Sequence, residues 1–256
     1  MNRKEKHRFS RLSALACFFD DLADAPYRHD NSNLPWQSNP EQYGQATDPG
    51  GVAVHLLHTL YQDLPPENLP IFKTFLHWVF NLETAGRQQN GQALSPEELQ
   101  RLTAEKGGCS VLLFRRLLDH PLSKAEQEAL FQFGALIQLS DDIFDLWFDR
   151  QNGIATLATL LTAQNDLPRL QQHFDRQTSA TIHAFRQTPY PRPQVETALH
   201  AVHFLVSITR VCLDHYCDLQ KKRGTLPLDD RRAMVVDMQR PGKRLRAGLK
   251  LLDKLL

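Results

Sequence analysis

One segment, residues 124–150, constrains the fold of this chain more than any other. Asp141, Asp145 and Asp149 recur every four residues within it. On an α-helix such positions drift by only about 80° while rising about 12 Å, so the three carboxylates form one narrow stripe. The other faces of this helix carry Leu130, Phe133, Leu136, Ile137, Leu139, Ile143, Phe144 and Trp147. Because a surface helix is normally polar over about half its circumference, the pattern predicts a central helix whose acidic stripe faces an internal cavity.

Helical signals recur along the rest of the chain, whereas strand signals are scarce. Ser95-Pro96-Glu97-Glu98 and Ser123-Lys124-Ala125-Glu126 are capping-box patterns. No Asn-Gly or Asp-Gly pair lies between alternating apolar runs. The predicted helices span residues 9–24, 51–63, 66–86, 96–119, 124–150, 154–163, 165–187, 192–220 and 228–238, with a last one from 241. Residues 25–50 have loop composition, and we predict a single all-α domain over residues 1–256.

Composition excludes several classes of protein. The chain has 256 residues, of which 41% are hydrophobic and 23% charged, and its formal net charge of +1 gives no reason to expect a nucleic-acid partner. It contains no run of about 18 apolar residues that would span a membrane, and its first residues lack the apolar core and cleavage site of a secretion signal. The four cysteines form no CxxC pair, which is typical of a reducing compartment. We therefore expect a cytoplasmic protein.

The acidic stripe has two interpretations. A solvated acidic face is the common explanation for a DDxxD sequence on a helix. Here, however, no Lys or Arg lies four residues from Asp141 or Asp145 to neutralise the stripe. Unpaired carboxylates at close range raise one another's pKa. Magnesium relieves this repulsion and prefers one or two carboxylates together with water and substrate phosphates, so the stripe favours a metal site.

A second acidic cluster lies about 120 residues upstream. Asp20, Asp21 and Asp24 follow the apolar run Ala16-Cys17-Phe18-Phe19, and Asp20 and Asp24 share one helical face. An acidic helix end before Pro26 would explain this cluster alone. Two DDxxD sequences in one helical chain are a much more specific signal for a metal site.

Residues 103–153 resemble a known family most closely. Thr103-Ala104-Glu105-Lys106-Gly107-Gly108 is similar to the lysine-bearing helix of prenyl diphosphate synthases, and residues 133–145 resemble their FG-x-x-x-Q-x-x-DD-x-x-D signature. Together with the upstream cluster, these motifs resemble the class I isoprenoid (terpenoid) synthase superfamily. The resemblance covers residues 9–153 and implies an all-α bundle around a central apolar cavity. In this superfamily two facing acidic helices hold magnesium ions that bind a substrate diphosphate.

The resemblance also implies roles for individual residues. The implied metal ligands are Asp20, Asp21, Asp24, Asp141, Asp142, Asp145 and Asp149, with Asp20, Asp24, Asp141 and Asp145 as the catalytic set. They would hold Mg²⁺, three ions per site, with Mn²⁺ as an alternative. The implied diphosphate ligands are Lys106, Arg150, Arg210, Lys222 and Arg223, with exposed solvating charges as the alternative for the last three. The expected substrate pocket is formed by Phe19, Phe75, Trp78, Gly107, Cys109, Gln138 and Phe144, for which helix packing or ordinary core burial is the alternative.

The resemblance implies an enzyme that ionises one prenyl diphosphate, either a terpene synthase or a related lyase, and then cyclises or quenches the carbocation. A prenyltransferase joining two isoprenoid diphosphates, as in prenyl diphosphate, squalene or phytoene synthases, is the first alternative. It is disfavoured because Arg28 alone follows Asp24, where chain-elongating enzymes carry paired arginines. Only 19 residues precede Asp20, fewer than the family's first helices need. This shortness favours the second alternative, a non-catalytic isoprenoid-binding bundle, and suggests a homodimer.

The C-terminal segment, residues 221–256, is basic. It holds eleven Lys or Arg residues against four Asp. Leu245, Leu249, Leu252 and Leu256 recur at helical spacing among Arg244, Arg246, Lys250 and Lys254. Such a helix either packs on the bundle or rests on an anionic membrane as a peripheral contact.

Overall fold

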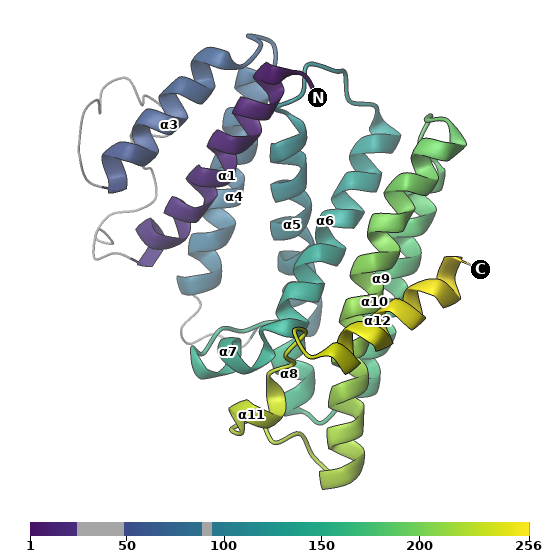
Figure 1. The fold of residues 1–256 in the computed structure, drawn as a ribbon. Helices are drawn as coiled ribbons and strands as arrows, with labels where there is room; N and C mark the ends of the chain where they lie inside the picture. The colour runs from purple at the N-terminus through teal and green to yellow at the C-terminus, as the bar shows by residue number, and fades with distance from the viewer. Residues whose placement is uncertain (25–48, 89–93, 256) are drawn as a thin grey trace. The chain divides into compact units, whose positions relative to one another are not determined.

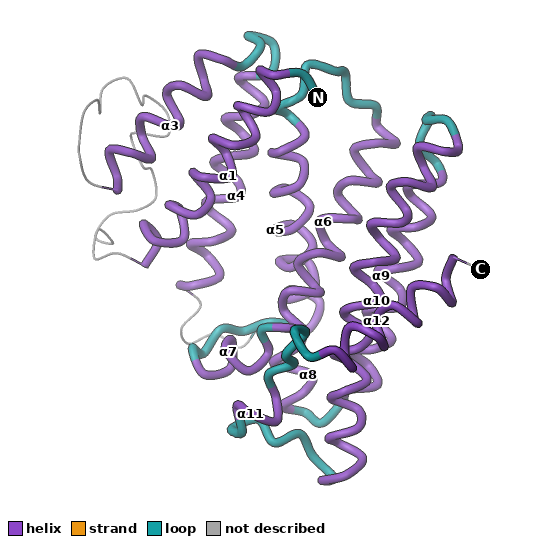
Figure 2. The backbone as a smooth tube through the Cα atoms, viewed as in Figure 1, coloured by secondary structure: helices purple, strands orange, loops and turns teal. Residues whose placement is uncertain are grey.

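The computed structural model describes the backbone of residues 1–24, 49–88 and 94–255, and the side chains of residues 1–17, 51–82 and 94–252. All regular secondary structure in these ranges is helical (Figure 2), which confirms the all-α prediction. The helices are α1 (Arg3–Asp24), α3 (Pro49–Asp63), α4 (Leu69–Gln88), α5 (Pro96–Arg115), α6 (Lys124–Phe144), α7 (Leu146–Gln151), α8 (Leu157–Ala163), α9 (Leu167–Arg186), α10 (Arg192–Arg223), α11 (Arg231–Met234) and α12 (Pro241–Leu255) (Figure 1).

Four predicted helix boundaries were wrong. The first helix begins at Arg3, and the helix predicted for 228–238 is reduced to α11. The helix predicted for 96–119 ends at Arg115, whose guanidinium donates to the carbonyl oxygens of His120 and Pro121 and so folds the chain back. The helix predicted for 124–150 is divided at Asp145 into α6 and α7.

The described chain divides into two compact units. Unit 1 comprises Met1–Ala85 and Cys109–Pro121, and unit 2 comprises Gly86–Gly108 and Leu122–Leu256. The single-domain organisation stays a prediction, and the two units are described separately below.

Unit 1 has its own apolar core. Leu12 of α1, Leu57 and Leu60 of α3 and Phe72 of α4 are fully buried in it. The buried guanidinium of Arg8 donates to the carbonyl oxygen of Leu117 at 3.0 Å and also pairs with the Asp119 carboxylate. These bonds tie the start of α1 to the turn that follows α5.

Unit 2 is built around α6, which packs against α9, α10 and α8. Leu136, Leu139 and Ile143 of α6 are fully buried together with Phe174 of α9 and Tyr216 of α10. α9 and α10 lie side by side, and α12 packs against α10 (Figure 1). The central position predicted for the helix of residues 124–150 is therefore confirmed within this unit for its α6 part, whereas the apolar cavity stays a prediction.

Glycines bring α5 and α6 into unusually close contact. A Cβ atom on Gly107 would lie 2.1 Å from the carbonyl oxygen of Gly134, and one on Gly134 would lie 2.2 Å from the carbonyl oxygen of Gly107. A Cβ on Gly108 would lie 2.3 Å from the ring of Phe131. The helix-packing alternative for Gly107 is therefore what the structure shows, since α6 fills the space that a side chain would take.

The break between α6 and α7 is stabilised by α10. Asp145 has φ −89° and ψ 8°, outside the regular helical range. Just before the break, the carbonyl oxygen of Ile143 accepts a hydrogen bond from the buried Tyr216 hydroxyl at 3.1 Å, and the Cys212 thiol lies 3.9 Å from it. A side-chain donor from α10 thus satisfies a buried carbonyl where the regular helix is interrupted.

Candidate metal centre

The candidate site forms where the close α5–α6 crossing meets the end of α6. Because glycine backbones touch at Gly107 and Gly134, a side chain one turn before Gly107 and a side chain two turns after Gly134 come within hydrogen-bond reach. Thr103 of α5 donates through its hydroxyl to the Asp142 carboxylate at 2.9 Å. The packing of small residues therefore places the polar groups of the site.

Asp142 is the buried member of the acidic cluster. One carboxylate oxygen accepts from Thr103 and the other accepts from the Gln138 side-chain amide at 3.0 Å. Burial raises the pKa of Asp142 to about 6, while the two hydrogen bonds and the positive charge of Lys106 oppose the shift. Its direct metal ligation stays a prediction, but both oxygens already have protein donors.

Asp141 and Asp145 are the exposed members, one turn apart on the same side. The Gln138 amide also donates to Asp141, at 3.3 Å, so this one side chain contacts two aspartates. The break at Asp145 preserves the four-residue spacing, because the amide of Asp145 donates to the Asp141 carbonyl and that of Asp149 donates to the Asp145 carbonyl, both at 2.8 Å. The acidic stripe therefore continues from α6 into α7.

Asp149 is half-buried at the end of this stripe. Burial and the charges of Asp142, Asp145 and Asp141 raise its pKa to about 7. Lys106 acts in the opposite direction on both Asp149 and Asp142. Four carboxylates thus interact with one another and with Lys106. A divalent cation bound among them would relieve the repulsion between their negative charges.

The other predicted basic ligands are dispersed over unit 2. Arg210 pairs with Asp175 of α9 and lies over the Phe174 ring, and Arg223 pairs with Asp230 at 3.5 Å. Lys222 is exposed in the last turn of α10. Their roles as diphosphate ligands stay predictions.

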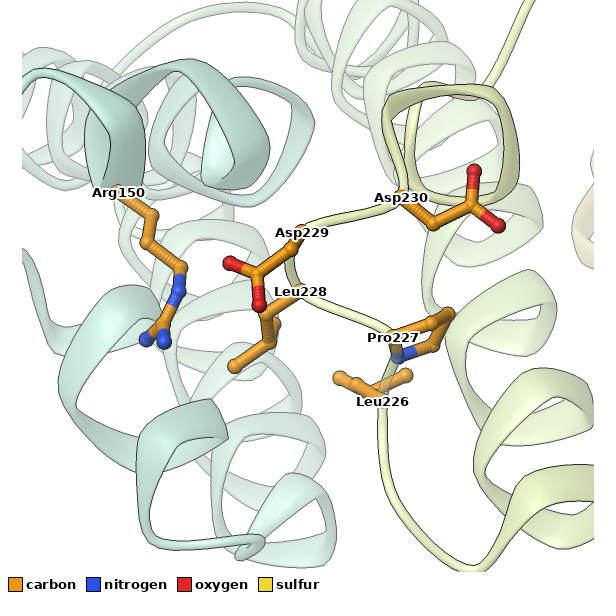
Figure 3. A pocket seen from close by; sticks show the side chains of 6 residues that line it. All are labelled: Arg150, Leu226, Pro227, Leu228, Asp229 and Asp230. Atoms are coloured by element: carbon orange, nitrogen blue, oxygen red, sulfur yellow. The ribbon is translucent and has the colours of Figure 1, made fainter.

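Arg150 lines an open pocket of about 550 Å³ between α7 and the segment that follows α10. Leu226, Pro227, Leu228, Asp229 and Asp230 complete its lining (Figure 3). Asp229 faces the pocket from the side opposite Arg150 (Figure 3), and Asp230, which also lines the pocket, pairs with Arg223.

The predicted substrate-pocket residues fall into both units. Gln138 and the half-buried Phe144 lie in unit 2, near the acidic cluster in sequence. Cys109 is buried in unit 1, where Phe75 stacks on the exposed Trp78 at 6.4 Å. Phe19 lies outside the described side chains. A common hydrocarbon pocket stays a prediction.

The upstream cluster is helical in its backbone. Asp20, Asp21 and Asp24 form the end of α1, but their side chains lie outside the described residues. Across the described side chains, no three His, Cys, Asp or Glu groups converge on a metal position. The donor chemistry of Asp141, Asp145 and Asp149 nevertheless fits Mg²⁺, which takes hard carboxylate oxygens and completes its shell with water or phosphate oxygens.

Three contacts near the site were not predicted from the sequence. Thr103 was noticed only as part of a motif, and Tyr216 carried no local signal. Arg231 lies over the rings of Trp147 and Phe148, at 5.5 and 5.6 Å from their centroids, and so binds α11 to α7. A run of basic residues gives no indication of which one stacks on an aromatic ring.

Comparisons with protein-family models, with curated proteins and with solved structures find no match. In the described residues no helix is long and apolar enough to cross a membrane.

Replacing Asp149 with asparagine is expected to stabilise the protein at pH 8 and to have little effect at pH 5. The pKa of Asp149 is raised in the fold, so between its ordinary value and about 7 the folded state binds more protons than the unfolded state, and the free energy of unfolding falls as the pH rises. After discounting for solvent screening at this half-buried group, we expect a gain of about 1 kcal/mol at pH 8. Urea unfolding at both pH values measures it.

The matched control is Asp166→Asn, at the N-cap of α9 away from the cluster, which is expected to change the free energy of unfolding little and equally at both pH values, because asparagine caps a helix about as well as aspartate. Equal effects of Asp149→Asn at pH 5 and pH 8 would contradict the electrostatic account of the cluster.

Proposed function

We propose that this protein is a magnesium-dependent class I isoprenoid enzyme that ionises a single prenyl diphosphate and releases pyrophosphate. The observation that carries the proposal is the stripe of Asp141, Asp145 and Asp149, which the backbone hydrogen bonds keep at four-residue spacing through the break at Asp145. Burial and the charges of Asp142 and the other two aspartates raise the pKa of Asp149, as expected for such a stripe. The repulsion among these four carboxylates, which Lys106 offsets only in part, costs the folded protein stability. A binding site for Mg²⁺ ions together with a diphosphate would explain why the fold keeps them together.

The residues have distinct roles in this proposal. Asp141 and Asp145, exposed and one turn apart, provide the carboxylate oxygens for metal ions. Asp142 is a positioning residue, since Thr103 and Gln138 hold it in the α5–α6 crossing. Gln138 orients Asp141 as well, through its second contact. Lys106 acts to lower the pKa of Asp142 and of Asp149, and in this proposal its positive charge would attract the diphosphate.

The reaction requires heterolysis of the bond between the allylic carbon and the diphosphate oxygen. The electron pair leaves with pyrophosphate, and the carbocation then cyclises, loses a proton or is captured by water. Bound Mg²⁺ would supply the positive charge that stabilises the leaving pyrophosphate. The aromatic and apolar residues predicted for the pocket would exclude water from the cation.

A turnover assay tests the proposed function. Purified protein is incubated with Mg²⁺ and prenyl diphosphates of graded chain length, with and without isopentenyl diphosphate, and pyrophosphate and organic products are measured. We expect pyrophosphate release from one substrate without isopentenyl diphosphate, and a product no longer than that substrate. A longer product would favour the prenyltransferase alternative. Tight binding of a prenyl diphosphate without pyrophosphate release, with Mg²⁺ or with Mn²⁺, would favour the isoprenoid-binding bundle.

A further inference from the structure

The C-terminal helix α12 exposes an apolar stripe. Leu245, Leu249 and Leu252 are 65%, 57% and 54% exposed. At 100° per residue these three positions fall within an arc of about 60°. Exposed leucines are ordinary when scattered, but three in one row along a helix form a surface feature that requires an explanation.

The opposite face of α12 attaches the helix to unit 2. Ala247 is buried, and Lys250 pairs with Asp214 of α10 at 2.7 Å. Lys243 is half-buried on the same side. Because this face already packs against α10, the leucine stripe is directed away from the bundle. The predicted packing of this helix on the bundle is therefore confirmed, but α12 packs through this face and not through the three leucines.

Cations border the stripe on both sides. Arg244 and Arg246 are exposed and lie about 100° to either side of Leu245 around the helix axis. From Gln239 to Leu252 the sequence contains five Lys or Arg residues and no Asp or Glu. A narrow apolar stripe with an exposed arginine on each side is the arrangement of a helix that lies in the plane of an anionic lipid surface, with its leucines among the acyl chains and its arginines at the headgroups.

A second copy of the chain fits this surface less well. The three leucines together expose less surface than two fully exposed leucines, whereas a stable dimer buries about 800 Å² per partner. A two-fold contact through α12 would also place the cationic borders of two copies against each other. Charge and area therefore both favour an acidic lipid surface over self-association.

We propose that α12 is a peripheral membrane-binding helix that docks the protein on anionic lipid bilayers through Leu245, Leu249 and Leu252, flanked by Arg244 and Arg246. The inference is independent of the reaction proposed above.

Vesicle sedimentation with the full chain tests the inference. Vesicles of phosphatidylcholine alone are compared with vesicles containing about one-third phosphatidylglycerol, at low and at physiological salt. We expect binding to the anionic vesicles that weakens with salt, and at least tenfold weaker binding to the neutral ones. The double variant Arg244→Gln/Arg246→Gln is expected to bind anionic vesicles about 25-fold more weakly, at about fivefold per charge removed.

The variant Leu249→Asp isolates the apolar contribution and is expected to weaken anionic vesicle binding more than tenfold. Its matched control is Phe204→Ser on α10, a residue 56% exposed, which is expected to leave binding unchanged. Thermal unfolding followed by circular dichroism is expected to be the same for both variants and wild type, because neither side chain is buried.

The absence of vesicle binding would overturn the inference. Equal binding of wild type and Leu249→Asp would overturn it as well. A monomer–dimer equilibrium in sedimentation velocity that Leu249→Asp abolishes, without vesicle binding by wild type, would assign the stripe to a second copy instead.

Discussion

Replacing Gly134 with alanine is expected to destabilise the protein by about 3 kcal/mol, and replacing it with leucine is expected to unfold unit 2. A Cβ atom at this position would lie 2.2 Å from the carbonyl oxygen of Gly107 and 2.8 Å from the Cα of Gly108. Both atoms are backbone, so no side-chain rotation relieves the overlap and the two helices must separate. Urea unfolding followed by circular dichroism measures the loss.

Gly248→Ala is the matched control for this prediction. Gly248 lies in the interior of α12, and a Cβ atom there would meet nothing within 4 Å. Alanine has a higher helix propensity than glycine, so we expect unchanged stability or a gain of up to about 1 kcal/mol. Wild-type stability of Gly134→Ala would contradict the close α5–α6 crossing.

Replacing Asp141 or Asp145 with alanine is expected to reduce pyrophosphate release from the prenyl diphosphate substrate at least a hundredfold. Removal of one preorganised electrostatic contact to a developing charge typically costs about 10² to 10³ in rate. Because both carboxylates are exposed and lie in a repelling cluster, neither change is expected to lower stability. Initial rates at saturating Mg²⁺ and thermal unfolding together measure the two effects.

Glu128→Ala provides the control for these two variants, since Glu128 is an exposed carboxylate on the same helix that contacts Gln132 and lies away from the cluster. It is expected to retain the wild-type rate. Full activity in both Asp141→Ala and Asp145→Ala would remove the acidic stripe from the reaction, whatever the substrate.

Local sequence patterns predicted the helix starts correctly where capping hydrogen bonds between residues close in sequence determine them. The Ser95 hydroxyl accepts from the Glu98 amide at 3.2 Å, and the Ser123 hydroxyl accepts from the Glu126 amide at 3.1 Å, as the two capping-box patterns predict. The break at Asp145 was missed because its stabilising donor, Tyr216, lies 73 residues from the carbonyl that it contacts. Helical periodicity contains no information about such a distant partner.

The same limit applies to the candidate site. Spacing predicted that Asp141, Asp145 and Asp149 share one side of the helix, and the electrostatic coupling of these residues agrees with that prediction. It did not predict that Asp142 would be buried by Thr103 and Gln138, because that depends on how closely α5 approaches α6. The two glycines that allow this approach were noted, but one sequence does not distinguish room for a ligand from room for a helix.

Titration calorimetry of pyrophosphate binding tests the central claim most directly, because it requires no knowledge of the organic substrate. In the presence of Mg²⁺ we expect wild type to bind pyrophosphate with an affinity that Asp145→Ala lowers at least tenfold and Glu128→Ala leaves unchanged. In the presence of a chelator we expect no binding by any of the three proteins. Equal magnesium-dependent binding by wild type and Asp145→Ala, or no binding by wild type, would contradict the assignment of this acidic cluster as a metal–diphosphate site.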